Sequence, residues 1–474
     1  MLGPGAERLW PGGRVWRVRL PGRGAALARL ARRPGVAAVE PDRARTVVGS
    51  PDPLGVDQPF LGLIHWTPPP SGGRRPLVAV LDTGVDATVP DLGGRVVTGA
   101  ARSFVPGSSP LEDQSGHGTH VAGIIAAAAE NGLGGAGVAD ARLLVVKIAD
   151  REGRATTASL VRGIHYALSR KARVINLSLS GVGSSPLEQE AIDDAARAGA
   201  LVVAAAGNSG RSGGPREYPG AYRHVLAVAA TADDGQPIPT STRGPQVAIS
   251  APGRRILSTA PGRGGAPRYV SRTGTSMASA IVSGVAARLL AHNPRLEASQ
   301  LRDMLLGSAT DLGPRGWDRA TGWGIVSLAG ALAAPVPPPD RPEPDDDPAD
   351  VAAEQPVSDA VGPAAAIVQG SVEHWADPGD DVRVVLDQGE TLDATLEGDP
   401  TADMDLVLWR PGAPAFVPGP AYLRQWLAAA EISPRSFERM VYKAPQAGVY
   451  TLEVQASSGR GRYRLTLRRQ PPVA

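Results

Sequence analysis

Short apolar runs alternate with helix-period segments between residues 51 and 334, and this pattern determines the expected fold of the region. The runs are LVAVL (77–81), LLVVKIA (143–149), RVINLSL (173–179), LVVAAAG (201–207) and HVLAVAA (224–230). Apolar runs of this length, separated by helical patterns, are typical of strands buried on both faces of a parallel sheet. We therefore predict an α/β domain with a mostly parallel, doubly wound sheet over residues 51–334.

The pattern changes after this region. Residues 335–366 begin with the proline- and acid-rich string PVPPPDRPEPDDDPAD, which cannot bury a core and predicts a semi-extended, solvated linker. Between residues 367 and 470, alternating runs such as DVRVVL, MDLVLW and VYTLEV stand between Gly, Pro and Asp turns. Alternation with a period of two predicts an antiparallel β-sandwich there. Residues 1–50 form a separate stretch with a helical pattern, AALARLARR.

Composition and charge exclude several kinds of partner and chemistry. The 474 residues are enough for roughly three domains. The 49 Lys and Arg are balanced by 47 Asp and Glu, for a net charge of +2, so we expect no nucleic-acid partner. The absence of cysteine excludes disulfides, thiolate zinc sites and cysteine nucleophiles. No apolar run approaches the roughly 18 residues of a membrane span, and the first 20 residues lack the apolar stretch of a secretion signal.

Two motifs place an acid and a histidine at the borders of predicted elements. Asp82 follows the first apolar run in LVAVLDTGVD, and ligand-binding groups of open α/β sheets gather at the carboxyl ends of strands. An ordinary turn or capping aspartate explains this motif equally well. In SGHGTHVAG, His117 stands between two glycines, which let a substrate backbone approach. A metal site is disfavoured because the motif lacks the glutamate of H-E-x-x-H. A capping histidine is the structural alternative.

Two further motifs hold an amide and a hydroxyl. Asn208 follows a glycine at the end of the run LVVAAAG, where a turn residue is the usual occupant. Ser276 begins the helical pattern TSMASAIVSGVAARLLAHN after Gly274, and a serine there is often a helix N-cap. The same location suits a nucleophile, because the N–H groups of the first turn favour developing negative charge.

Taken in the order Asp, His, Asn and Ser, the strings VLDTGVD, GHGTHVAG, AAAGNSG and GTSMAS resemble the signatures of the subtilisin-like serine peptidases, or subtilases. The resemblance implies that Ser276 attacks the scissile carbonyl and that His117 takes the serine proton and returns it to the leaving amine. It implies that Asp82 orients the imidazole, while Asn208 and the Ser276 backbone N–H bind the oxyanion.

Other residues of these motifs have supporting roles by the same resemblance. Gly118, Thr119 and His120 are interpreted as packing and framing residues. The family usually has proline after GTSMAS, where this chain has Ala280. Because alanine favours helix, the change affects local rigidity more than catalysis.

The resemblance also implies how an extended substrate peptide binds. NLSLSG aligns with the strand that pairs with the substrate backbone, and EGRA matches an edge strand on the opposite flank, so the peptide would lie between two edges. Small side chains around the primary specificity pocket predict a broad, apolar-leaning preference. The implied substrate-binding residues are Gly153, Arg154, Ser178, Leu179, Ser180, Ala205, Ala206 and Gly207.

A structural calcium site is a further implication. Subtilases often build one from an N-terminal carboxylate, a loop aspartate and a loop asparagine, and Asp52, Asp91 and Asn131 fall at matching places. Calcium takes about six to eight oxygen ligands, so backbone carbonyls must supply the rest. Three ordinary turn residues explain the pattern equally well, and the glycine-rich loop 132–137 departs from the family pattern. The resemblance implies no cofactor for catalysis.

The N-terminal stretch resembles part of the subtilase propeptide through GAALARLARRPGVAAVEPDRAR. A subtilase propeptide is an intramolecular chaperone and inhibitor, so residues 1–50 are interpreted as a small α+β propeptide remnant. The resemblance implies a zymogen cleaved between Arg45 and Asp52. The usual first half of the propeptide has no room before Met1, and we hypothesise an internal start or natural trimming.

The C-terminal stretch resembles the pre-peptidase C-terminal domain of many secreted bacterial peptidases, through LDQGETLDATLEG, DMDLVLW and APQAGVYTLEV. By resemblance we expect a secreted, monomeric enzyme that binds protein or peptide substrates and its own propeptide. The expected core residues are Trp375, Trp409 and Tyr450, and a solvated turn is the favoured interpretation of Asp403 and Asp405 over a cation site.

Two other functions are compatible with parts of the pattern. A pseudopeptidase would use the same cleft only to bind proteins, but all four catalytic positions are filled. An acyl-transferring esterase shares the acyl-enzyme chemistry, but the chain lacks the G-x-S-x-G elbow of the α/β-hydrolases. The pattern therefore favours a serine endopeptidase.

Overall fold

The fold is described from a computed structural model. It covers residues 52–338 apart from 213, 264 and 265, and most of residues 365–471. Before residue 52 it describes only positions 7, 8, 16, 17, 32, 34 and 36. The chain divides into two compact units, Met1–Ser50 and Pro51–Ala474.

The larger unit contains a seven-stranded sheet in the order β4-β5-β3-β6-β7-β8-β9, and every pairing in it is parallel. This confirms the predicted doubly wound sheet. The apolar runs form strands because their residues are buried on both faces of the sheet. The strands are β3 (Leu77–Asp82), β4 (Arg102–Ser103), β5 (Arg142–Lys147), β6 (Val174–Leu177), β7 (Leu201–Ala205), β8 (Val225–Thr231) and β9 (Val247–Pro252).

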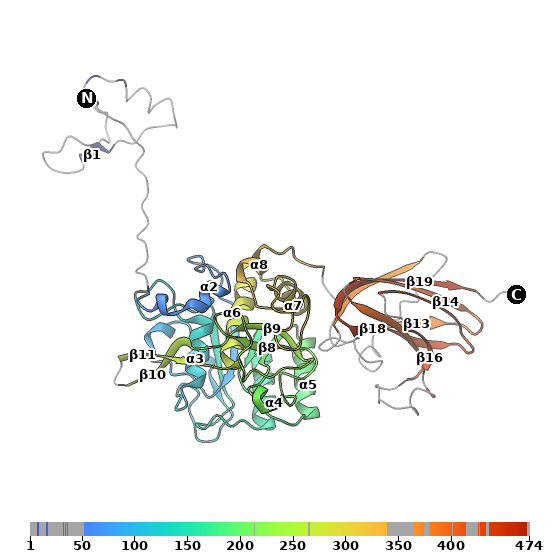
Figure 1. Ribbon diagram of the computed structural model, residues 1–474, viewed down its shortest axis with the longest axis horizontal. Helices are drawn as coiled ribbons and strands as arrows, with labels where there is room; N and C mark the ends of the chain where they lie inside the picture. Colours follow the sequence, from blue (N-terminus) through green and yellow to red (C-terminus); the bar gives the residue numbers. More distant parts are fainter. Residues whose placement is uncertain are drawn as a thin grey trace. The chain divides into compact units, whose positions relative to one another are not determined.

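Helices cover both faces of this sheet (Figure 1). Alternating side chains divide between two cores, so that Val78 and Val80 pack on one side while Ala79 and Leu81 pack on the other. The first core includes α3 (His117–Ala126) and α6 (Thr275–His292), and the second includes α4 (Thr157–Ser169) and α5 (Pro186–Arg197). Every residue of α6 from Thr275 to Leu290 is buried, so this helix forms the centre of its layer.

Smaller elements surround the sheet. An antiparallel hairpin, β10 (Ile256–Arg263) and β11 (Ala266–Arg272), packs against α3. The remaining short helices are α2 (Pro59–Leu63), α7 (Ala298–Gly307) and α8 (Leu328–Ala333), with single 3₁₀ turns at Gly55–Asp57, Pro90–Leu92, Thr98–Ala100 and Gly210–Ser212.

The C-terminal part is an antiparallel β-sandwich, as the alternating runs predicted. Its two four-stranded sheets have the orders β12-β19-β14-β17 and β13-β18-β15-β16 and share one apolar core. Trp409 and Tyr450 are buried as expected, Asp405 is buried on β15 rather than in a solvated turn, and Trp375 lies outside the described residues. The strands are β12 (Ala366–Glu373), β13 (Gly379–Leu386), β14 (Thr391–Gly398), β15 (Asp403–Trp409), β16 (Leu427–Glu431), β17 (Phe437–Lys443), β18 (Gly448–Ser458) and β19 (Arg460–Gln470).

In the N-terminal unit the described strands are β1 (Glu7–Arg8) and β2 (Trp16–Arg17), which pair antiparallel. The predicted helix AALARLARR, the cleavage segment and most of the predicted linker lie outside the described residues.

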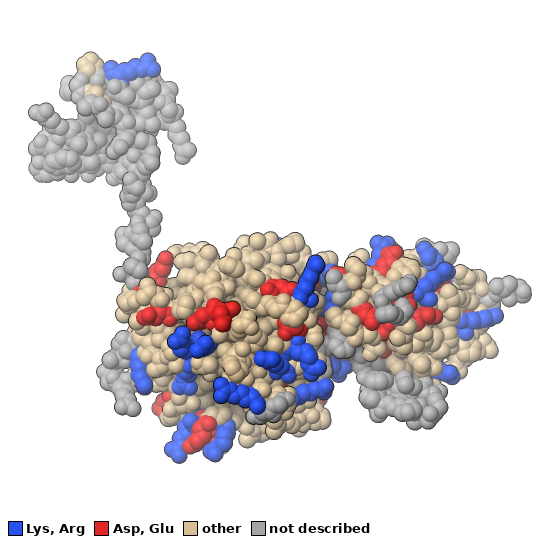
Figure 2. All heavy atoms as spheres, viewed as in Figure 1, with Lys and Arg blue, Asp and Glu red and all other residues tan. Residues whose placement is uncertain are grey.

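On the face drawn in Figure 2, the basic and acidic side chains of the described residues are interspersed. Within the described residues, no helix has the length and apolar character needed to cross a bilayer.

Candidate active site

The four sequence-predicted catalytic residues lie where strands end or helices begin. Asp82 is the last residue of β3, and Asn208 comes shortly after the end of β7. His117 is the first residue of α3, and Ser276 lies in the first turn of α6. Since the carboxyl ends of parallel strands meet at one edge of a sheet, this topology brings residues from distant parts of the chain to the same edge.

Asp82 and His117 form a partly buried hydrogen-bonded pair. The imidazole Nδ1 lies 2.7 Å from Oδ1 of Asp82, and the two side chains are 22 % and 4 % exposed respectively. The same oxygen accepts the backbone N–H of Thr83 at 2.7 Å. Burial lowers the pKa of His117, but the charge and hydrogen bond of Asp82 outweigh burial and hold this pKa above its ordinary value of 6.5. The pair therefore fixes the ring and favours its protonated form.

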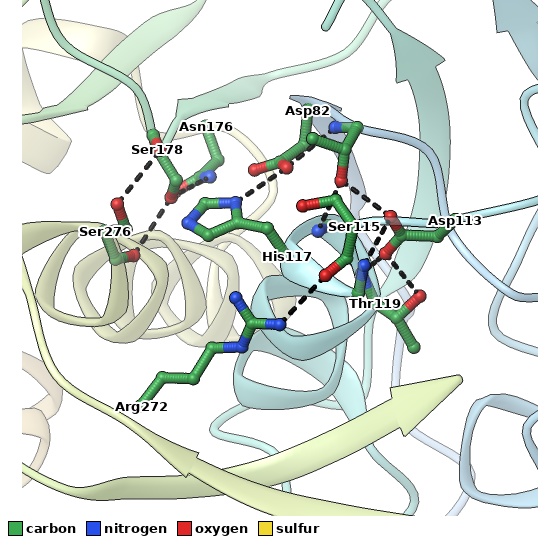
Figure 3. Close-up of polar contacts among 12 residues, drawn as sticks. Asp82, Asp113, Ser115, His117, Thr119, Asn176, Ser178, Arg272 and Ser276 are labelled. Atoms are coloured by element: carbon green, nitrogen blue, oxygen red, sulfur yellow. Dashed lines mark hydrogen bonds and ion pairs between the residues drawn. The ribbon is translucent and has the colours of Figure 1, made fainter. Parts of the chain in front are cut away.

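Ser276 lies on the other side of the imidazole from Asp82 (Figure 3). In this structure its hydroxyl donates to the carbonyl of Ser178 at 3.0 Å rather than to His117. The Ser178 hydroxyl in turn donates to the Ser276 carbonyl at 2.9 Å, so two hydrogen bonds join the end of β6 to the first turn of α6. Catalytic hydrogen bonds are often long or misaligned without substrate. Carboxylate and imidazole are thus hydrogen-bonded to each other, while the Ser276 hydroxyl is hydrogen-bonded to the Ser178 carbonyl.

Asn208 is oriented by the start of α6. Its Oδ1 accepts the backbone N–H of Thr275 at 3.1 Å, which fixes which amide atom faces the helix. The exposed carboxamide therefore presents its NH₂ group away from the helix as a donor. The Ser276 backbone N–H belongs to the first helical turn, where N–H groups have no partner within the helix. An oxyanion hole is built from donors of these two kinds, a side-chain amide and a backbone N–H.

Sequence reasoning missed the residue that positions His117. Asp113, which is 5 % exposed, accepts the backbone N–H groups of Gly116 and Thr119 at 2.9 and 2.8 Å. It also accepts the hydroxyls of Thr83 and Thr119, both at 2.7 Å. Asp113 thereby joins the residue after Asp82 to the residues on both sides of His117. A carboxylate four residues before the glycine-flanked histidine was the available signal.

The other members of the histidine motif frame the site, as interpreted from sequence. A Cβ at Gly118 would lie 2.1 Å from the Gly84 carbonyl oxygen, so only glycine fits there. His120 is fully buried, with Nε2 3.0 Å from the carbonyls of Ile256 and Val270. Burial lowers its pKa to about 4, so His120 is neutral at physiological pH.

The predicted substrate-binding residues differ from one another in exposure and in local structure. Ser178 contacts Ser276 directly, but Ala205 and Ala206 are 1 % and 0 % exposed and present no open side-chain surface. Gly153 and Arg154 lie in a tight turn between the bridged residues Ala149 and Ala155 rather than in a regular edge strand. The reason is that Asp150 accepts the backbone N–H groups of Glu152 and Arg154 and closes the turn.

The same region contains an acidic side chain that the sequence analysis did not single out. Glu217 is 5 % exposed and accepts the hydroxyl of Ser180 at 2.6 Å. It also accepts the Ser209 backbone N–H at 2.9 Å and the Thr242 hydroxyl at 2.5 Å. A carboxylate therefore lies among the segments expected to form an apolar specificity pocket. In the sequence, nothing distinguished Glu217 from other acidic residues in loops.

The predicted calcium ligands come together, but their oxygens already accept hydrogen bonds. Asp52 accepts the backbone N–H groups of residues 130–132 at 2.9 to 3.3 Å. Asp91 accepts the Asn131 amide at 2.7 Å and the Tyr269 hydroxyl at 3.0 Å, while Oδ1 of Asn131 accepts the Leu133 N–H at 2.8 Å. A calcium ion requires oxygen atoms turned toward it. In this structure these side-chain oxygens accept hydrogen bonds that join the loops, and the calcium site stays a prediction.

Known proteins are similar to a large part of this chain. The profile of the subtilase family matches residues 73–324. The thermostable alkaline protease of Halalkalibacterium halodurans is 41 % identical over 288 residues, which cover 60 % of this chain and 76 % of that protein. Subtilisin E of Bacillus subtilis is 39 % identical over 295 residues, covering 61 % of this chain and 74 % of that protein. A solved lanthipeptide protease structure covers 54 % of this chain and 86 % of its own at 26 % identity and a TM-score of 0.48. This protein belongs to the subtilase family of serine peptidases.

Proposed function

We propose that this subtilisin-like serine endopeptidase cleaves peptide bonds through a triad of Ser276, His117 and Asp82, with Asn208 as an oxyanion donor. The observation that carries the proposal is the 2.7 Å contact between Asp82 and the His117 Nδ1. This contact leaves Nε2 for the serine, and Figure 3 shows His117 between Asp82 and Ser276.

The chemistry has two stages. Ser276 Oγ forms a bond to the scissile carbonyl carbon while its proton passes to His117 Nε2. The carbonyl oxygen becomes an oxyanion, which accepts hydrogen bonds from the Asn208 amide and the Ser276 backbone N–H. The C–N bond then breaks, the leaving amine takes the proton from Nε2, and water repeats the sequence to release the acid. The proposal requires one movement, a side-chain rotation of Ser276 from the Ser178 carbonyl toward the imidazole.

An active-site probe tests the proposal directly. A fluorophosphonate should label the wild-type protein and leave Ser276→Ala unlabelled, and only the labelled protein should degrade casein. Ser283→Ala is the matched control, because it removes another buried hydroxyl from α6 and should keep the labelling. A folded wild-type protein that is neither labelled nor active would instead favour a protein-binding pseudopeptidase.

We further propose that the enzyme is made as a zymogen with residues 1–50 as inhibitor, and that it acts outside the cell as a monomer. The support is the propeptide-like sequence of residues 1–50 and the similarity of the chain to known subtilisins. Structural calcium at Asp52, Asp91 and Asn131 stays a prediction, and no catalytic step depends on it. The apolar-leaning substrate preference also stays a prediction. The buried carboxylate of Glu217 argues against it.

A further inference from the structure

Glu217 joins the two segments that follow β6 and β7. Its Oε2 accepts the hydroxyl of Ser180 on the first segment. On the second, a Cβ at Gly207 would lie 2.2 Å from Oε1, so the glycine backbone packs directly against the carboxylate. The next residue, Tyr218, exchanges two backbone hydrogen bonds of 2.8 and 2.9 Å with Gly181. The carboxylate is therefore held between the two segments.

This position lies close to the atoms that would react. Ser209, which donates its N–H to Glu217 at 2.9 Å, directly follows Asn208. Ser180 stands two residues after Ser178, whose carbonyl accepts the Ser276 hydroxyl. In a bound peptide, P1 is the residue whose carbonyl is attacked. Its side chain is attached to the carbon next to that carbonyl. The resemblance places the P1 side chain along these same segments, residues 178–180 and 205–207, and Glu217 contacts both of them.

The Glu217 carboxylate is charged, and among the described residues its hydrogen-bond donors are neutral groups. Burial raises its pKa, but hydrogen bonds from Ser180, Thr242 and Ser209 outweigh burial and lower the pKa overall. Among the described residues, Ser180 is the donor to Oε2, which leaves acceptor capacity on that atom. A buried carboxylate without a cation is costly, and an incoming cation offsets that cost.

We propose that Glu217 determines specificity by binding the cationic side chain of an arginine or lysine at P1. The inference rests on the proposed function, because it assigns the substrate class of the same site. The planar guanidinium of arginine matches a carboxylate in a bidentate geometry, so arginine is the better ligand of the two. The preference is therefore basic, in place of the apolar-leaning one expected from the small side chains.

Peptide p-nitroanilides that differ only at P1 test this inference. Wild-type kcat/KM should be at least tenfold higher for arginine than for leucine or phenylalanine. Glu217→Gln should lower kcat/KM for the arginine peptide about 30-fold or more and change the leucine value about threefold or less, because only the charge pair is lost. Glu190→Gln is the matched control, since it removes an exposed carboxylate from α5 and should change neither value.

Inhibition of the wild-type protein provides a second readout that does not depend on a folded variant. A peptidyl arginal should inhibit more strongly than the matching phenylalaninal. The inference is overturned if leucine or phenylalanine is preferred, or if folded Glu217→Gln keeps the arginine preference; the peptidase assignment then stands. Hydrolysis of no peptide, together with no fluorophosphonate labelling, overturns both proposals.

Discussion

Two aspartate clusters in this protein share residue types but differ in how many polar groups they leave available. Around Asp91, each side-chain oxygen of the cluster accepts a hydrogen bond from a nearby N–H or hydroxyl. Around Asp82, the second carboxylate oxygen has no donor among the described residues, and the Asn208 amide nitrogen is left over. The saturated cluster stabilises loops, whereas unsatisfied polar groups beside a nucleophile and an imidazole are expected where chemistry takes place.

Asp82→Asn should have the largest effect, because it alters the group that orients His117. We expect kcat to fall about 10⁴-fold, the size associated with loss of the correct imidazole tautomer in serine proteases. Steady-state hydrolysis of a peptide substrate measures this change. A loss below tenfold would show that Asp82, like Asp91, is only structural.

Asn208→Ala should lower kcat by about 10²–10³, a magnitude taken from subtilisin itself. Asn208 also accepts the backbone N–H of Thr275. The substitution therefore removes both this hydrogen bond and the proposed oxyanion donor. Asn208→Asp separates them, because it keeps the cap oxygen but removes the donor. If Asn208→Asp retains wild-type kcat, the role of Asn208 is the cap rather than the oxyanion.

The pH dependence should reveal the Asp82–His117 pair through kcat/KM. A general base must be neutral, so activity should fall about tenfold per pH unit below the His117 pKa, which Asp82 holds above 6.5. For stability the sign is opposite, because protonated His117 stabilises the fold below about pH 6.5 and this contribution is lost as the pH rises through the folded-state pKa. If kcat/KM starts to fall only below pH 6.5, the raised pKa of His117, and with it the pairing to Asp82, would be contradicted.

Tyr269→Phe should have the smallest effect, because it removes one hydrogen bond from the saturated cluster. We expect a loss of about 1 kcal/mol in the free energy of unfolding and unchanged kcat/KM. If the cluster needs no ion, a chelator should leave the wild-type Tm within about 2 °C. A large rise in Tm with added calcium would instead support the predicted calcium site.

The sequence predicted much of the fold because its apolar runs are long and buried on both faces. It missed β4, which has two residues, and β9. It also extended the run 201–207 beyond Ala205, where β7 ends. That error has a functional reason, since the residues after Ala205 leave the sheet and lead to Asn208. Apolar composition continues there, but strand pairing ends with the bond from the Ala206 N–H to the Val228 carbonyl.

The motifs named Asp82, His117, Asn208 and Ser276, and their resemblance to the family implied that these residues act together, but the motifs did not indicate the side chains that hold them in place. Asp113 and Glu217 escaped notice because an acid in a loop has no periodic pattern, and their partners come from other segments of the chain. Ala205 and Ala206 were expected at the pocket because of their place in the sequence, whereas the packing of the sheet covers them.

By itself, the sequence determined the apolar periodicity, the order of the elements and the local motifs, because these depend on residues close together in the chain. Only the tertiary structure decided which supporting groups meet, since hydrogen bonds such as Thr83–Asp113 and Ser180–Glu217 join residues that are 30 and 37 positions apart. It also decided which polar atoms remain available for a ligand, because each acceptor is satisfied by whichever donor the packing brings near.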